Sequence, residues 1–172
     1  MYFETLINSA LLIKKMGFKI YWIILGDGRK KKFAEKKCNE LGLSKEFIFL
    51  GSYPSYEMPN YFSCADALIV SLKNEPIFSM TIPNKVQSYM ACGKPIIASL
   101  TGEGAKCILE SGSGFVAESE NEIKLSEKII EFFELDNFKK NEMGLNGRKY
   151  FMKEFEINKL INKLIKIISN DK

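Results

Sequence analysis

The chain has 172 residues, of which 46% are hydrophobic and 27% charged, and its net charge is +4. This is the composition of a globular domain with a buried core, so it excludes a disordered chain, and the longest apolar run is too short to span a membrane. The absence of histidine excludes a Ser-His-Asp triad, a histidine base and most zinc catalysis.

The first predicted element is a helix over residues 2–15, because its apolar residues recur at helical spacing and Gly17 follows. A β-rich run then ends at Gly26. Farther along, short apolar runs alternate with segments of helical pattern. The predicted strands are 19–25, 47–50, 67–70, 95–99 and 114–117, and the remaining predicted helices are 30–41, 56–64, 83–92, 120–134, 138–150 and 157–168.

Short strands with continuous apolar runs, separated by helices, are typical of a parallel sheet covered on both faces. Right-handed crossovers between such strands give an α/β fold with a doubly wound parallel sheet, whose ligands bind at the carboxyl ends of the strands. A doubly wound domain normally opens on a strand, whereas this chain opens on a helix. We therefore expect residues 1–172 to form a single domain that lacks its first strand and has extra helices at its carboxyl end.

The last predicted helix has a strongly apolar side. We expect that side to pack against its own domain; the alternative is that part of it is exposed and favours self-association. Its apolar residues are Phe155, Ile157, Leu160, Ile161, Leu164, Ile165 and Ile168.

The cysteines are spread along the chain without a CxxC pair. This usage predicts free thiols in a reducing compartment and argues against a disulfide framework or a zinc site. Because there is also no signal peptide, we expect a cytoplasmic protein without a metal. The four positions are Cys38, Cys64, Cys92 and Cys107.

One tight basic run covers residues 29–32 at the start of a predicted helix. We interpret it as a solvated helix face; the alternative is attraction to phosphate or to anionic lipid. A nucleic-acid-binding protein usually has a larger concentrated patch, so no nucleic-acid partner is expected.

Three loops that follow predicted strands are expected at one rim of the sheet: 26–28, 51–54 and 74–85. Gly26 and Gly28 let the backbone approach a phosphate or a base, although a plain tight turn explains them equally well. The loop is neither a GxGxxG nor a GxxxxGK[ST] motif, so a dinucleotide site or a P-loop lacks support.

The loop 74–85 leads into a predicted helix, whose first turn offers unpaired N–H groups suited to a diphosphate. It carries Ser79, Thr81 and Lys85. A lysine in the first turn opposes the helix dipole unless an anion lies nearby, so Lys85 indicates an anion site; the alternative is a lysine that points into water.

Aromatic and acidic residues supply the other candidates. Tyr53 and Tyr89 could stack on a base, although either could equally belong to the core. Glu75 is the candidate for bonding sugar hydroxyls and for a catalytic role; the alternative is a solvated loop side chain.

Several runs, in order and at the expected spacing, resemble the carboxyl-terminal domain of glycosyltransferase family 4. The likeness extends from about residue 3 to residue 168. The runs are IILGDG (23–28), FIFLG (47–51), ADALIVS (65–71), PNKVQSYMACGKPIIA (83–98) and MGLNGR (143–148).

The resemblance implies the Rossmann-like half of a two-domain GT-B glycosyltransferase, with this half binding a UDP- or GDP-sugar donor and an absent amino-terminal domain binding the acceptor. It further implies a hexosyltransferase type of enzyme that transfers the sugar with retention, without a cofactor or a metal for the chemistry. Capsule, lipopolysaccharide or glycolipid synthesis is the expected role. The fragment alone is expected to be inactive. Peripheral contact with the inner membrane face is expected through the missing half.

The same resemblance assigns candidate donor contacts. The loop with Gly26 and Gly28 would lie near the nucleotide, and Tyr53 with Pro54 near the base. Thr81 and Lys85 would hold the diphosphate. Ser88 stands where the family often has the second of two glutamates and could bond a ribose hydroxyl.

Two departures from the family pattern stand out. The first of the two glutamate positions holds Met80 and the second holds Ser88, so neither is acidic. The family's Gly-Arg and Lys diphosphate contacts would lie upstream of residue 1. The alternative functions are a non-catalytic Rossmann-like binding or scaffold module, and another GT-B enzyme such as a nucleotide-sugar epimerase.

Overall fold

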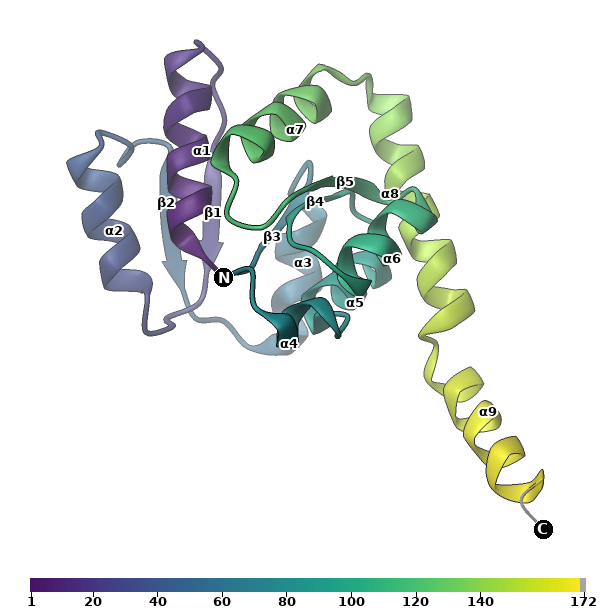
Figure 1. Cartoon of the computed structure of the whole chain (residues 1–172). Helices are drawn as coiled ribbons and strands as arrows, with labels where there is room; N and C mark the ends of the chain where they lie inside the picture. Colours follow the sequence, from purple (N-terminus) through teal and green to yellow (C-terminus); the bar gives the residue numbers. More distant parts are fainter. Residues whose placement is uncertain (171–172) are drawn as a thin grey trace.

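The computed structural model of the protein describes residues 1–170 (Figure 1). Its strands are β1 (Trp22–Leu25), β2 (Phe47–Gly51), β3 (Leu68–Ser71), β4 (Ile96–Ser99) and β5 (Gly114–Ala117). Its helices are α1 (Phe3–Lys15), α2 (Lys31–Glu40), α3 (Met58–Ser63), α4 (Pro76–Ser79), α5 (Asn84–Ala91), α6 (Glu103–Ser111), α7 (Glu122–Glu134), α8 (Asn137–Glu154) and α9 (Ile157–Asn170), with a 3-10 turn at Ser55–Glu57.

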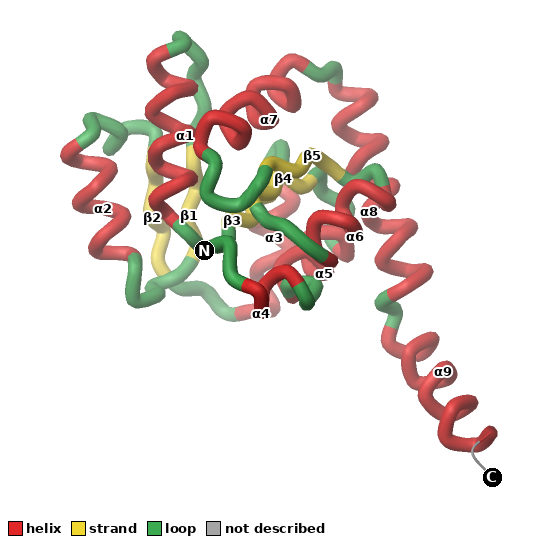
Figure 2. The backbone as a smooth tube through the Cα atoms, viewed as in Figure 1, coloured by secondary structure: helices red, strands yellow, loops and turns green. Residues whose placement is uncertain are grey.

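The strands of the described residues pair in parallel, and each connection between them contains a helix (Figure 2). This arrangement confirms the predicted α/β class with a doubly wound parallel topology. The strands fall into two sheets, β1–β2 and β3–β4–β5, a division that the sequence pattern did not indicate. Ile23 pairs with Ile48 in the first sheet, and Ile97 pairs with both Ile69 and Phe115 in the second.

Strand β4 explains why the strands appear in the sequence as continuous apolar runs. Ile97 belongs to a core cluster with residues of α1, α2 and α7, whereas Ile96 and Ala98 belong to a second cluster with residues of α5 and α6. Successive side chains of a strand point to opposite faces. Both faces of β4 are therefore covered, and each of its positions has to be small or apolar.

Two helices lie where the sequence pattern predicted no helix. The turn α4 lies inside the predicted loop 74–85, and α6 occupies a segment without a prediction. In α6 the buried apolar side chains are only Cys107 and Ile108, so its pattern is too sparse to recognise. Strand β1 begins at Trp22 rather than at residue 19, because pairing with β2 begins there.

The last helix, α9, does not pack its apolar side on the domain. Figure 1 shows it projecting away from the body beyond α8. Leu160 is 41% exposed and Ile157 64%, so the expectation of packing against the same domain is wrong and the alternative of an exposed face holds. None of the helices within residues 1–170 is both long and apolar enough to cross a membrane.

Helix α8 approaches the end of α5 so closely that only glycine fits. A Cβ on Gly144 would lie 2.2 Å from the carbonyl oxygen of Gly93. Arg148, one turn later on α8, donates a hydrogen bond to the carbonyl of Ala91 at the end of α5. The two family-like runs around residues 90–93 and 143–148 therefore meet in space, and this contact fixes the position of α5.

Substitution of Gly144 by alanine should destabilise the domain by about 1–3 kcal/mol, because the added methyl group collides with backbone rather than with a movable side chain. Gly28→Ala is the matched control, since nothing lies within 4 Å of its Cβ position. Urea unfolding followed by circular dichroism measures both. Equal stability of the two variants would contradict the close packing of α8 on α5.

Candidate functional site

The loops that follow β1 and β2 are joined by the carboxylate of Asp27. The backbone N–H of Ser52 donates to Asp27 Oδ2 at 3.0 Å, and the N–H of Gly26 donates to the carbonyl of Gly51 at 2.6 Å. Lys31 pairs with the other carboxylate oxygen. The hydrogen bonds from Lys31 and Ser52 lower the pKa of Asp27 below its usual value. Two of the three predicted loops thus form one connected rim.

The two candidate glycines of this rim differ. Gly26 has a φ of +122°, which disfavours any other residue, and its amide is used in the bond to Gly51. Gly28 is exposed, has an ordinary φ and leaves open space around its Cβ position. Backbone conformation therefore explains Gly26 alone and leaves room for a ligand beside Gly28.

Tyr53 and Pro54 lie on the exposed side of the same rim. Tyr53 is 39% exposed, and its ring lies 4.6 Å from that of Tyr61 at a tilt of 47°. Pro54 begins the turn before α3 and accepts a hydrogen bond from Glu57. Tyr89 is buried and packs edge-on against Phe62, so it belongs to the core and is not a second stacking ring.

A pocket of about 190 Å³ lies between the carboxyl end of β3 and the first turn of α5. The residue before α5 is Pro83, which offers no side-chain cap. Within residues 1–170 the backbone N–H groups of Asn84 and Lys85 have no hydrogen-bond acceptor. The pocket is lined by Met1, Val70, Ser71, Leu72, Pro83, Asn84 and Lys85.

Lys85 is a cation without a counter-ion in the part of the chain that the structure describes, since no carboxylate there lies within ion-pair distance of its amine. Its side chain reaches solvent, yet desolvation along the pocket lowers the pKa of its amine. Desolvation and the nearby charge of Lys85 also lower the pKa of the Met1 amine. An uncapped helix start and an unneutralised lysine therefore face the same pocket, which suits an anion.

The segment between β3 and α5 is held by the loop that precedes α6. Gly102 has a φ of +78°, and a Cβ there would lie 2.0 Å from the carbonyl oxygen of Ser79. A Cβ on Gly104 would lie 2.8 Å from Pro83. Thr81 donates its hydroxyl to the carbonyl of Ile77 at 3.1 Å, which leaves its oxygen free to accept. The two glycines after β4 therefore shape this side of the site, and sequence reasoning missed them although both lie shortly after the predicted strand 95–99.

The remaining candidates on this side are exposed. Glu75 supplies its carbonyl to Phe78 and Ser79, while its carboxylate has no partner among the described residues. Ser88 lies one turn after Lys85 on the exposed side of α5. No described hydrogen bond joins this segment to the rim around Asp27, because the sheet is divided between β1 and β3. The three predicted loops therefore form two groups.

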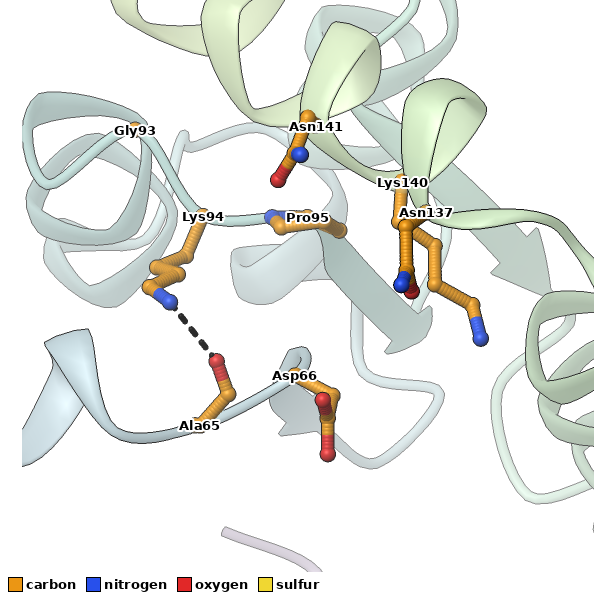
Figure 3. Close-up of a pocket in the computed structure, with 8 residues that line it drawn as sticks. All are labelled: Ala65, Asp66, Gly93, Lys94, Pro95, Asn137, Lys140 and Asn141. Carbon is orange, nitrogen blue, oxygen red and sulfur yellow. Dashed lines mark hydrogen bonds between the residues drawn. The ribbon is translucent and has the colours of Figure 1, made fainter.

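A larger pocket, of about 330 Å³, lies at the opposite ends of the strands (Figure 3). Ala65 and Asp66 precede β3, and Lys94 precedes β4, so this pocket is at the amino ends. The amine of Lys94 donates a hydrogen bond to the carbonyl of Ala65 at 2.8 Å. Sequence reasoning did not predict the pocket, because α8 supplies the other wall. That wall consists of Asn137, Lys140 and Asn141.

The thiols vary in exposure. Cys38 and Cys107 are buried, and burial raises the pKa of each to about 11, so both are neutral thiols at pH 7. Cys64 is exposed, and all four cysteines are free. Within residues 1–170 no three His, Cys, Asp or Glu side chains gather as metal ligands would.

Residues 2–150 match the family model described as Glycosyl transferases group 1. The chain is 28% identical over 138 residues to an uncharacterized glycosyltransferase of Methanocaldococcus jannaschii, which covers 80% of this chain and 37% of that protein. It is 20% identical over 151 residues to the Vi polysaccharide biosynthesis protein VipC/TviE of Salmonella typhi, which covers 87% of this chain and 25% of that protein. The chain thus spans well under half the length of these relatives.

Solved structures share the fold. The C-terminal domain of the glycosyl transferase group 1 family protein LpcC of Francisella tularensis matches with a TM-score of 0.69 and 21% identity, over 89% of this chain and 78% of that one. Anabaena HepE in complex with UDP and glucose matches with a TM-score of 0.78 and 21% identity, over 96% of this chain and 44% of that one. S. aureus TarM in a complex that contains UDP matches with a TM-score of 0.80 and 17% identity, over 96% of this chain and 32% of that one.

The bond between Asp27 and Ser52 predicts a pH dependence. Because the folded state lowers the pKa of Asp27, the bond is present above the ordinary value of 3.8 and is lost only as the pH falls through the lower folded value. The amide resonance of Ser52, followed by NMR, should therefore titrate with a midpoint below 3.8. Asp27→Asn should abolish the transition. A midpoint at or above the ordinary value would show that the bond is absent in solution.

Proposed function

We propose that this chain, which belongs to the glycosyl transferases group 1 family, binds the nucleotide-diphosphate sugar donor of a retaining glycosyltransferase at the carboxyl ends of its strands. The observation that carries the proposal is the pocket before α5, where Lys85 lacks a counter-ion and two backbone N–H groups lack acceptors. A diphosphate supplies the missing acceptors and the missing charge.

With the diphosphate at the start of α5, the other candidate residues receive the following roles. Thr81 borders the diphosphate with a hydroxyl oxygen that can still accept a hydrogen bond. Ser88, one turn along α5, bonds a ribose hydroxyl. The rim of Gly26, Gly28, Tyr53 and Pro54 receives the nucleoside, with the exposed Tyr53 ring beside the base.

The chemistry assigned to this half is stabilisation of the leaving group. When the bond between the anomeric carbon and the diphosphate breaks, negative charge grows on the diphosphate oxygen. Lys85 and the start of α5 are already oriented toward that charge, so they stabilise the transition state more than the ground state. Glu75, whose carboxylate has no partner among the described residues, is the proposed contact for the hydroxyls of the transferred sugar.

The whole enzyme is proposed to be a hexosyltransferase in which a second, amino-terminal domain binds the acceptor, so that residues 1–172 alone bind the donor without turning it over. Surface polysaccharide synthesis is the proposed role, supported by the similarity to the Vi polysaccharide biosynthesis protein of Salmonella typhi. A UDP-sugar is the favoured donor, since the structures of HepE and TarM are complexes that contain UDP. The free thiols support a cytoplasmic location, with any contact to the inner membrane face made through the second domain.

Calorimetric titration with UDP and with GDP tests the donor site. Lys85→Ala should weaken binding of the preferred nucleotide roughly 10- to 150-fold, because a charge-assisted hydrogen bond contributes about 1.5–3 kcal/mol. Lys106→Ala is the matched control, since that lysine on α6 is exposed and pairs with Glu110. Equal affinity of the two variants, or no binding at millimolar nucleotide, would contradict the proposal and favour a scaffold module.

A further inference from the structure

Glu120 is the only residue other than glycine that has a positive φ among residues 1–170. Its φ is +62°, in the left-handed region, and the other positive φ angles of the described chain belong to glycines. A residue with a Cβ atom is strained in that region. Such strain persists only where the surrounding structure holds the residue in place, and it is frequent at functional sites.

The neighbours of Glu120 explain why the chain turns there. The hydroxyl of Ser99, at the end of β4, donates to the carbonyl of Glu118 at 3.1 Å. On the other side, Asn121 caps α7, because its side chain accepts a hydrogen bond from the amide of Lys124 at 2.9 Å. The chain is therefore fixed shortly before and directly after the turn. These contacts require a left-handed residue, which a glycine would supply without strain, but they do not require a glutamate.

The side chain of Glu120 makes a contact that a glycine cannot make. Its Oε2 accepts a hydrogen bond at 3.1 Å from the backbone N–H of Asn74, which has no other acceptor among the described residues. Asn74 follows β3 and Glu120 follows β5, and β4 lies between these two strands in the sheet. The contact therefore reaches across the carboxyl end of β4 and ties the loop 74–85 to the loop after β5.

Glu75 lies directly beyond this anchor. Its backbone is extended, with φ −119° and ψ 139°, as expected for a residue that precedes a proline, here Pro76. Its carbonyl accepts a hydrogen bond from the amide of Phe78 at 2.9 Å, so it already belongs to the turn α4. The backbone of Glu75 is therefore restrained on one side by Glu120 and on the other by α4, and these restraints set the direction in which its side chain leaves the chain.

We propose that Glu120 is a positioning residue for sugar recognition: its carboxylate anchors Asn74 and thereby directs the side chain of Glu75 toward the hydroxyls of the donor sugar. This inference rests on the proposed function, which assigns those hydroxyls to Glu75. The hydrogen bond to Asn74 offsets the strain of the left-handed backbone, which explains a glutamate at a position that suits glycine.

The anchor acts on the first part of the loop 74–85. The later part is held by the loop before α6, where a Cβ on Gly102 would collide with the backbone of Ser79. Lys85 lies still farther along, on α5, whose own buried side chains position it. Loss of the anchor should therefore change binding of the sugar and leave binding of the diphosphate unchanged.

Three substitutions of the exposed Glu120 separate reach, charge and strain. Glu120→Gln keeps an acceptor at the same reach, Glu120→Asp keeps the charge on a side chain one methylene shorter, and Glu120→Gly relieves the strain without an acceptor. The Asn74 amide should exchange with water roughly two- to tenfold faster in the aspartate and glycine variants, whereas the glutamine variant should stay close to the unsubstituted chain. NMR measures these rates without nucleotide, and circular dichroism checks that each variant is folded.

Calorimetry with UDP and with UDP-glucose, UDP-galactose and UDP-N-acetylglucosamine tests the sugar step. At least one of these sugar nucleotides should bind the unsubstituted chain about threefold or more tightly than UDP does. Glu120→Gly and Glu75→Ala should each abolish that difference and leave the affinity for UDP within about twofold, and Glu120→Gln should retain it. The double variant should lose nothing further, because both changes act through the same carboxylate.

Four results would overturn the proposal. The first is equal exchange at Asn74 in the unsubstituted chain and in Glu120→Gly. The second is a glutamine variant that behaves like the glycine variant. The third is a further loss of sugar affinity when Glu120→Gly is added to Glu75→Ala. The fourth is a chain that binds UDP but none of the sugar nucleotides more tightly. Absence of UDP binding would instead contradict the donor-site proposal, and the exchange rates at Asn74 would still decide whether Glu120 anchors the loop.

Discussion

The position of helix α5 is the constraint on which the site depends. Val86, Tyr89 and Met90 are buried against the strands, and the close approach of Gly144 to Gly93 fixes the far end of the helix. Because one side and the carboxyl end of α5 are fixed, the first turn of α5 borders the pocket at the end of β3. The backbone of Lys85 is therefore positioned by packing that lies elsewhere on the same helix, so the proposed anion site needs no movement of α5.

The sequence predicted the fold correctly where both faces of a strand are buried. Strand β4 is covered on both faces, so its apolar run Ile96–Ser99 is unambiguous and the parallel α/β class follows. Prediction failed where few apolar side chains are buried. Helix α6 buries few apolar side chains, so its sequence shows no helical periodicity. Helix α9 has a clear apolar face, but that face is exposed and does not pack against the domain as predicted.

The sequence predicted which loops contribute to the candidate site but not how those loops lie relative to one another. The sequence left open whether Gly26 serves a tight turn or lets the backbone approach a ligand, and its positive φ fits the turn. The role of Gly102 depends on its contact with Ser79, which lies far from it in sequence. The division of the sheet separates the Asp27 rim from the α5 pocket.

The most direct test of the donor site is NMR mapping of the amide resonances of the 172-residue chain during titration with UDP. The largest shifts are expected at Asn84 and Lys85, whose amides lack acceptors among the described residues, and smaller shifts are expected around Ser52 on the Asp27 rim. Shifts that gather instead at Lys94 and Asn141 would place the ligand in the larger pocket at the amino ends of the strands. That result would contradict the central claim that the start of α5 binds the diphosphate.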